Sequence, residues 1–247
     1  MVSFEVVERR SLSEAVFEQL RGGILTGELE AGSSLPAERE LAVELGVNRS
    51  AVREALKRLQ QLRLVAIRQG ESTRVLDFRR TGGLELLVSM LLSSGGGLHL
   101  DVARGLVEMR GALGPDIAAR AAARRTDDHV HELRGRLTAF EAVAADDHVA
   151  REAASFELWR VLVAASDNLA YQLAFNTMER VWASIREVLA PTLAPELVDG
   201  RRYRRLVAAV VDGDDAAARR VATQLVTKGT EAVIALVDGW RRDGGSP

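Results

Sequence analysis

The sequence of 247 residues has no cysteine, only five prolines, and few aromatic residues, which make up 4% of the chain. The absence of cysteine excludes disulfides and any metal centre with thiolate ligands. Hydrophobic residues make up 47% of the chain and are mainly Ala, Leu and Val. Together with the scarcity of proline, this composition favours helices over sheets. No apolar run approaches the roughly 18 residues of a membrane span, and the start of the chain lacks the hydrophobic region of a secretion signal. We therefore expect a mainly α-helical cytoplasmic protein with no membrane partner.

The residues of common catalytic sites are also missing. No His is placed near a Ser or a carboxylate pair at a catalytic spacing, and no glycine-rich phosphate loop follows a predicted strand. The run Gly95-Gly96-Gly97 follows a predicted helix and indicates a turn. The sequence therefore argues against an enzyme.

The segment from Pro36 to Leu59 has the pattern of two short helices around a tight turn. Residues 37–44 are predicted to be helical, and Gly46 ends that helix because glycine readily adopts the left-handed conformation. Asn48 is a good N-cap for the second helix, in which apolar residues recur at the i, i+3, i+4, i+7 spacing of one buried face. These residues are Val52, Ala55, Leu56 and Leu59. The pattern predicts a helix-turn-helix, whose second helix can lie in the major groove of DNA.

Basic charge is concentrated in and after the second of these helices. Residues 49–74 carry a net charge of +5, from seven Lys or Arg and two acids, whereas the whole chain carries −2. Residues 64–68 and 72–76 are predicted to form two short strands joined at Gln69 and Gly70. Such a hairpin is a wing, and a glycine at its tip lets the backbone approach a minor groove closely. Any single Arg here could simply solubilise a helix, but helix, turn, basic helix and wing together predict DNA binding.

Several stretches carry a resemblance to a known family. They are Leu35-Pro36-Ala37-Glu38-Arg39-Glu40-Leu41, Gly46-Val47-Asn48-Arg49-Ser50 and Val52-Arg53-Glu54-Ala55-Leu56. They resemble the GntR family of bacterial winged-helix repressors, and residues 73–78 and 81–84 resemble its FadR branch, which includes fatty-acid regulators. The resemblance implies a homodimer on a near-palindromic DNA operator. The DNA-binding residues that it implies are Arg39, Asn48, Arg49, Ser50 and Arg53, together with Gln69 and Gly70 in the wing.

The rest of the chain is predicted to be helical. We expect a winged helix-turn-helix of three helices over residues 1–76, a linker over residues 77–83, an all-helical domain over residues 84–240 and a tail over residues 241–247. The first of the three helices covers Ser11 to Thr26. The later domain is predicted to be an antiparallel bundle of about seven helices, in agreement with the FadR branch. Its predicted helices span residues 84–92, 100–125, 127–145, 148–165, 169–189, 194–212 and 216–239.

The resemblance also bears on metals. Many members of the FadR branch hold a metal in this bundle with one Asp and three His. The corresponding positions here are Ser155, Trp159, Tyr203 and Leu225, and none of these side chains is a good ligand for such a divalent metal. We therefore expect no bound metal and no other cofactor.

An effector site is expected in the same bundle, around Arg110, Trp159 and Tyr203. Arg110 matches an inward-facing arginine of the family, and a charge that faces an apolar bundle needs a partner. That partner could be the carboxylate, phosphate or thioester group of an effector, or Glu108 or Asp116 of the protein itself. Trp159 and Tyr203 stand where the fatty-acid regulators have aromatic residues.

The expected function is a ligand-responsive transcriptional regulator. A long-chain fatty acyl-CoA is the first effector that the resemblance implies, and a small organic acid held by Arg110 is the second. The last helix differs from the fatty-acid regulators, which have small polar and aromatic residues at the positions of Val226, Gly229 and Val233. A DNA-binding protein with no effector is the remaining alternative.

Overall fold

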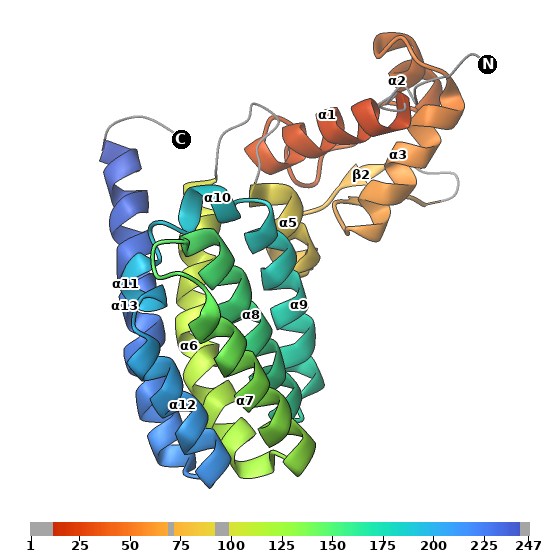
Figure 1. Cartoon of the computed structure of the whole chain (residues 1–247). Helices are drawn as coiled ribbons and strands as arrows, with labels where there is room; N and C mark the ends of the chain where they lie inside the picture. Colours follow the sequence, from red (N-terminus) through yellow and green to blue (C-terminus); the bar gives the residue numbers. More distant parts are fainter. Residues whose placement is uncertain (1–11, 69–71, 92–98, 243–247) are drawn as a thin grey trace, which may run out of the picture. The chain divides into compact units, whose positions relative to one another are not determined.

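The computed structural model describes residues 12–68, 72–91 and 99–242. These residues form two compact units that divide after residue 97, and Figure 1 labels the elements of both. The first unit holds the helix-turn-helix and wing. The second is the helical bundle. The mainly helical fold predicted from the sequence is confirmed.

The first unit contains five helices and a small sheet. Their bounds are α1 (Leu12–Thr26), α2 (Glu38–Glu44), α3 (Arg49–Gln61), β1 (Val65–Ala66), β2 (Arg74–Val75), α4 (Phe78–Thr81) and α5 (Glu85–Leu91). The turn between α2 and α3 forms as predicted, since Gly46 has a φ of +64°. The Asn48 side chain caps α3 by accepting a hydrogen bond from the backbone N–H of Ala51 at 2.8 Å.

The buried face of α3 is the centre of this unit. Its apolar residues at the helical spacing, Val52, Ala55, Leu56 and Leu59, are all at most 1% exposed. They pack against the apolar side of α1, where Phe17 and Leu20 are buried in the same core. This packing turns the opposite face of α3, with its basic residues, toward solvent.

The wing has shorter strands than the sequence suggests. In β1 and β2, Val65 pairs with Val75 and Ala66 pairs with Arg74 in antiparallel register. Arg74 also forms a bridge with Ser34, from the loop before α2. The predicted tip at Gln69 and Gly70 lies outside the described residues.

The segment predicted to be a linker is folded onto the first unit. Asp77 caps α4 by accepting from the N–H of Arg79 at 3.1 Å, and the Thr81 hydroxyl donates to the carbonyl oxygen of Arg63 at 2.9 Å. Leu86 of α5 is buried in the core of the same unit. By these contacts, residues 77–91 belong with the helix-turn-helix, whereas the sequence pattern placed the start of the helical domain at residue 84.

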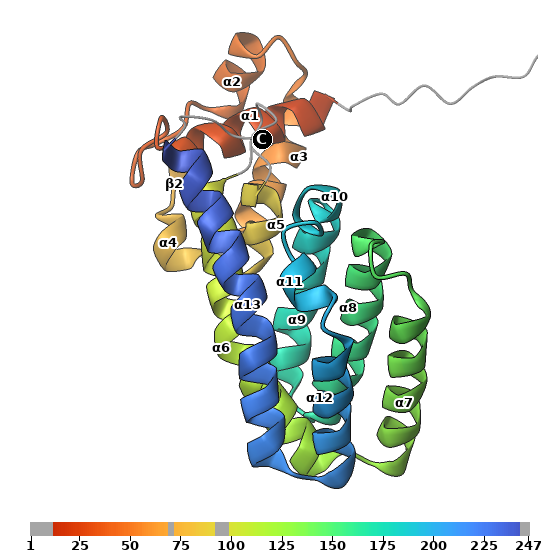
Figure 2. The ribbon, with the colours of Figure 1, turned by 60° about the vertical axis from the view of Figure 1, so that its left-hand side comes forward.

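The second unit is an antiparallel helical bundle, as predicted. Its helices are α6 (Leu100–Arg124), α7 (Asp127–Ala142), α8 (His148–Ala165), α9 (Leu169–Ala183), α10 (Arg186–Leu189), α11 (Ala194–Leu197), α12 (Gly200–Asp212) and α13 (Asp215–Arg242). The long helices α6 and α13 lie side by side, and α8 and α12 pack against α6 as well (Figures 1 and 2). Helix α7 covers α8 and α12.

Two of the predicted helices are each split in two. The segment 169–189 is interrupted after Ala183, where the Ser184 hydroxyl donates to the carbonyl oxygen of Val181 at 2.6 Å. Such local bonds of serine compete with the helical backbone. The segment 194–212 is interrupted at Asp199, which caps α12 by accepting from the N–H of Arg202 at 3.3 Å. The breaks create the short helices α10 and α11. Helix α11 carries Glu196, one of the buried charged residues of the bundle.

Candidate functional site

The exposed face of α3 carries the predicted DNA-binding residues of the helix-turn-helix. Asn48, Arg49, Ser50 and Arg53 are all exposed, and Arg39 is exposed on α2. The helix places Arg49, Ser50 and Arg53 on its N-terminal half, the part of a recognition helix that meets base edges in helix-turn-helix proteins.

One carboxylate organises the arginines of this face. Glu38, at the start of α2, accepts a hydrogen bond from Arg53 Nη2 at 2.9 Å, and its two oxygens share the Nε–H of Arg53 at 3.2 Å each. Arg49 Nη2 lies 3.9 Å from the same carboxylate. The hydrogen bond from Arg53 holds the pKa of Glu38 below its usual value. All three side chains remain accessible to solvent, so DNA phosphates can compete for the arginines.

Arg58 serves the fold rather than the DNA-binding face. Its guanidinium binds Glu14 of α1, with Nη1 2.6 Å from the carboxylate, and lies 4.0 Å from the centre of the Phe17 ring. These contacts tie α3 to α1. The basic charge counted in the sequence is therefore only partly available to a phosphate backbone.

The base of the wing adds two basic side chains to the predicted DNA-binding residues. A cavity of about 210 Å³ is lined by Arg68 and Arg74, with Ala66, Ser72 and Leu76. Arg74 is exposed on β2. The alternation of side chains along a strand could have identified Arg74, because Val75 beside it points into the core.

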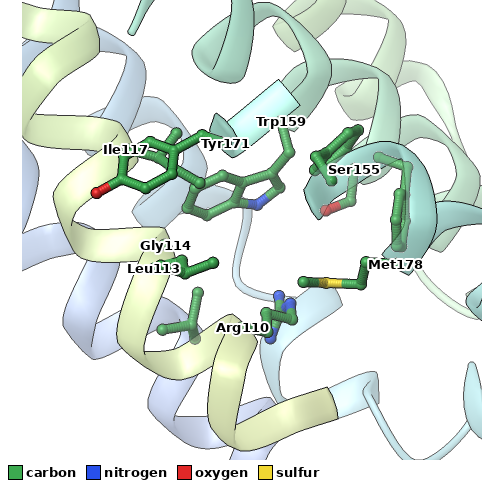
Figure 3. A pocket seen from close by; sticks show the side chains of 11 residues that line it. Arg110, Leu113, Gly114, Ile117, Ser155, Trp159, Tyr171 and Met178 are labelled. Carbon is green, nitrogen blue, oxygen red and sulfur yellow. The ribbon is translucent and has the colours of Figure 1, made fainter. Parts of the chain in front are cut away.

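The second site is an apolar pocket inside the bundle, shown in Figure 3. Its volume is about 40 Å³, and its walls come from α6, α8, α9 and α13. The lining residues are Arg110, Leu113, Gly114, Ile117, Ser155, Phe156, Trp159, Tyr171, Phe175, Met178 and Val226. The structure thus brings the predicted residues Arg110 and Trp159 into one pocket. The aromatic and Met residues of its wall were missed, since helical spacing alone does not separate core from pocket.

Arg110 is paired inside the protein, with a partner that the sequence did not indicate. Its Nη1 donates to Glu196 Oε2 at 3.0 Å, and its Nη2 also bonds the Glu196 carboxylate. The expected candidates were Glu108 and Asp116, but Glu108 is half exposed beside Arg104 and Asp116 binds other groups. Burial acts to lower the pKa of Arg110, and the Glu196 carboxylate more than offsets this, so the pKa is raised. The Arg110 guanidinium therefore stays charged inside the bundle.

Gly229 of α13 leaves the space that the Glu196 carboxylate occupies. A β-carbon at Gly229 would lie 2.1 Å from Glu196 Oε2 and 2.9 Å from Leu193 Cδ2. Such distances are far below van der Waals contact, so the carboxylate needs the bare backbone at this position. Glu196 sits on the short helix α11 and is 1% exposed.

Tyr203 lies behind the pocket wall rather than in it. Its hydroxyl is 2.8 Å from the Ser155 hydroxyl, and Ser155 lines the pocket. The Tyr203 ring packs against Phe140, with ring centres 4.1 Å apart. Burial raises the pKa of Tyr203 well above its usual value, so the hydroxyl stays protonated. Ser155 and Tyr203, which the resemblance predicts to be two of the four metal-ligand positions of the FadR branch, are thus joined by a neutral hydrogen bond.

Tyr171 connects the pocket to a charged cluster. Its ring lines the pocket while its hydroxyl points away (Figure 3) and donates to Asp116 at 2.8 Å. Asp116 also accepts from Arg219 at 2.6 Å and from Arg120 at 2.5 Å. Hydrogen bonds from Arg219, then Arg120, then Tyr171 hold the pKa of Asp116 far below its usual value. Two partly exposed guanidiniums share this one carboxylate, so the cluster is net positive.

Among the helices of the described residues, none is long and apolar enough to cross a membrane. Within the same residues, no three His, Asp or Glu side chains gather as a metal site would require.

Known protein families match both units of the chain. Residues 12–75 match the gntR family of bacterial regulatory proteins, and residues 105–228 match the FCD domain. The chain is 34% identical over 236 residues to the HTH-type transcriptional regulator Mce2R of Mycobacterium tuberculosis, covering 96% of this chain and 97% of that one. It is 30% identical over 183 residues to a fatty acid metabolism regulator protein of Serratia proteamaculans, covering 73% of each chain.

Solved structures support the fold. Lar, described as controlling the expression of the Listeria monocytogenes agr system, matches with a TM-score of 0.54 at 16% sequence identity, over 95% of this chain and all of that one. The relatives are transcriptional regulators, not enzymes. With a helix-turn-helix, a wing and a helical FCD domain in one chain, the protein belongs to the GntR family of DNA-binding transcriptional regulators.

Proposed function

We propose that this regulator binds operator DNA as a homodimer and that a metabolite in the bundle pocket controls the binding. Arg39, Arg49 and Arg53 would contact bases and phosphates, and the wing would contact an adjacent minor groove. Two recognition helices of a dimer reach half-sites about 34 Å apart, one turn of DNA. The exposed arginines of α3 and the basic base of the wing support this arrangement.

We further propose a long-chain fatty acyl-CoA as the metabolite, in control of fatty-acid metabolism genes. One observation carries this proposal: the pocket is apolar, and the Arg110 charge in its wall is already neutralised by Glu196. Such a site suits a hydrocarbon chain. The relative from Serratia proteamaculans is named as a fatty acid metabolism regulator, which points to the same class of ligand.

The pairing of Arg110 disfavours the alternative effector, a small organic acid. Both terminal nitrogens of Arg110 bond Glu196, so an acid must displace that carboxylate. Glu196 is 1% exposed, and an unpaired buried charge left by a broken ion pair costs about 3–5 kcal/mol. A hydrocarbon chain needs no such displacement.

Binding of a long chain would also provide the switch. The pocket of about 40 Å³ is much smaller than the roughly 300–1,000 Å³ of typical ligand sites. A long acyl chain therefore needs its walls to separate, and α9 contributes Tyr171, Phe175 and Met178 to them. A ligand that binds only the separated arrangement shifts the population toward it. That shift would alter the spacing or freedom of the two DNA-binding units.

The charged part of coenzyme A needs basic partners outside the apolar pocket. The cluster of Arg120 and Arg219 around Asp116 meets this need, because it is net positive and partly exposed. Tyr171 joins it to the pocket wall. The phosphates would bind there while the acyl chain enters between α6, α8 and α9.

DNA binding is tested with variants of the exposed face. Arg49→Ala is expected to weaken operator binding by about 5- to 150-fold, the range for one base-contacting arginine, with an unchanged circular dichroism spectrum. Arg80→Ala, an exposed arginine of α4, is the matched control and should bind normally. Equal affinity of the Arg49→Ala variant and the unaltered protein would refute the assigned face. Sedimentation of the protein–DNA complex tests the dimer.

The effector is tested by calorimetry on delipidated protein. Hexadecanoyl-CoA should bind saturably, whereas acetyl-CoA and free hexadecanoate should bind much more weakly. Binding of small carboxylates instead, lost in Arg110→Met, would favour the organic acid. No binding of any of these compounds would leave only the DNA-binding part of the proposal.

A further inference from the structure

Four side chains that line the bundle pocket can donate a hydrogen bond: Arg110, Ser155, Trp159 and Tyr171. Three of them are engaged inside the protein. Arg110 bonds Glu196, the Ser155 hydroxyl bonds Tyr203, and the Tyr171 hydroxyl donates to Asp116. Each of these three groups already has a polar partner inside the protein.

Trp159 is different. Its indole Nε1 is buried, and among the residues described it has no hydrogen-bond partner. The whole residue is only 7% exposed. Figure 3 shows the indole nitrogen on the ring edge that faces the space between Ser155, Met178 and Arg110. A buried donor without an acceptor is costly to a folded protein, so a donor of this kind beside a pocket indicates a place for an acceptor.

The position of the indole is fixed by its neighbours. A β-carbon at Gly114 would lie 3.4 Å from Trp159 Cη2 and 3.3 Å from Val226 Cγ1. The ring of Trp159 therefore packs directly on the backbone of α6, and Val226 borders the same place. A ring held this way keeps its N–H aimed in one direction, which favours binding of an acceptor at a defined position.

We infer that the Trp159 Nε1–H is the specificity-determining donor of the pocket, and that it binds a neutral carbonyl oxygen of the effector. This inference rests on the proposed function. For an acyl-CoA, the acceptor is the thioester carbonyl, next to an acyl chain in contact with Phe156, Phe175 and Met178. Amides and esters with a long chain present the same acceptor.

The donor selects a neutral carbonyl over a free carboxylate. A carboxylate beside Trp159 would be a charge in an apolar site, where the guanidinium that lines the pocket, that of Arg110, is already paired with Glu196. A buried charge without a counter-ion is strongly disfavoured. A carbonyl oxygen satisfies the indole N–H and brings no charge. The pocket should therefore distinguish a fatty acyl thioester from the fatty acid released by its hydrolysis.

The test compares two ligands that differ only at the acceptor. Hexadecanoyl-CoA has the thioester carbonyl, and S-hexadecyl-CoA has a methylene in its place. By calorimetry, the unaltered protein should bind the thioester about fivefold to tenfold more tightly, the ratio typical of one hydrogen bond. In Trp159→Phe, which keeps an aromatic wall without the donor, the two affinities should become equal within about twofold.

Trp182→Phe is the matched control. Trp182 is buried and its Nε1 is also without a partner in the described part of the chain, but it does not line the pocket. This variant loses a buried indole N–H and should keep the full preference for the thioester. A preference that persists in Trp159→Phe, or that disappears equally in Trp182→Phe, would overturn the inference.

A second measurement follows ligand binding to the unaltered protein. The sequence contains three Trp residues, 159, 182 and 240, so ¹⁵N-indole spectra are simple, and variants that fold assign the signals. The thioester should shift one indole proton, that of Trp159, downfield, while S-hexadecyl-CoA should not. Equal binding of both ligands without this shift overturns the inference but leaves the acyl-CoA proposal standing. No binding of either ligand to the unaltered protein overturns both.

Discussion

Arginine–glutamate pairs occur in both units of this protein, in opposite surroundings. In the DNA-binding unit, the side chains of Arg53 and Glu38 are 56% and 31% exposed. In the bundle, those of Arg110 and Glu196 are 14% and 1% exposed. The bonds are alike, since each pair has more than one N–H···O contact. The two pairs differ in how easily a new partner replaces the old one, because solvent and anions reach the first pair freely, whereas the second is mostly buried.

The difference explains the two kinds of site. An exposed pair contributes little to stability, so Glu38 can hold the arginines ready and yield them to DNA phosphates. A buried pair is costly to break, so Glu196 keeps Arg110 occupied and leaves an apolar pocket beside it. The same residue types thus provide a charged binding face in one unit and a neutralised pocket wall in the other. Four substitutions test this contrast, from the largest expected effect to the smallest.

Removal of Glu196 should have the largest effect on stability. In Glu196→Ala the Arg110 guanidinium loses its counter-ion while it remains mostly buried, and we expect a loss of about 3 kcal/mol in the free energy of unfolding. Urea denaturation, followed through the transition of the bundle, measures it. Glu108→Ala, which removes a half-exposed carboxylate on α6, should leave the midpoint unchanged. A loss of similar size in both variants would contradict the special role of the buried pair.

A methyl group at Gly229 should separate the pair without removing either charge. Its β-carbon would lie 2.1 Å from Glu196 Oε2, so Gly229→Ala must displace the carboxylate or α13. Overpacking typically costs about 1–3 kcal/mol, and we expect about 2 kcal/mol after the gain in helix propensity. Gly239→Ala on the same helix meets no atom within 4 Å and should be neutral or stabilising. Thermal denaturation of the two variants gives the comparison.

A methyl group at Gly114 should act on the pocket more than on stability. Its β-carbon would lie 3.3 Å from Val226 and 3.4 Å from Trp159, close enough to require small shifts of the pocket wall. We expect the affinity for hexadecanoyl-CoA to fall about tenfold, the effect of about one methylene in a fitted apolar site. Gly105→Ala, on the same helix with open space around it, should bind normally. Equal affinities in calorimetry would place the acyl chain elsewhere.

The two units also differ in how much of their structure the sequence predicts. The helix-turn-helix follows from local signals, because Asn48, Gly46 and the apolar spacing of α3 act over a few residues and are all found as predicted. The exposed side of α3 then follows from the buried one. Even here, contacts over 44 residues, such as that between Arg58 and Glu14, had no sequence signal.

In the bundle, the sequence predicted helices but not how their charges pair. Arg110 and Glu196 are 86 residues apart, and Glu196 lies on α11, a helix of four residues with no periodicity to detect. The pairing depends on the break at Asp199 and on the space at Gly229, and neither is visible before the helices are packed. The pocket has the same origin, since its residues come from four helices whose apolar faces look alike in sequence.

The smallest effect is expected from Glu38, and it separates affinity from specificity. Glu38→Gln removes a negative charge from the exposed face and frees Arg49 and Arg53 from their partner. Affinity for non-operator DNA should rise about threefold at low salt, and this gain should fade as salt increases because the effect is electrostatic. Operator affinity should gain less, since the arginines lose the carboxylate that orients them. The ratio of operator affinity to non-operator affinity should therefore fall.

Glu44→Gln is the control variant. It makes the same charge change at the other end of α2, where no ion pair with an arginine is found within the described chain, and it should keep this ratio unchanged. Fluorescence anisotropy over a salt series measures both. If Glu38→Gln and Glu44→Gln behave alike, Glu38 contributes only its charge, and the exposed pair does not prepare the arginines for DNA.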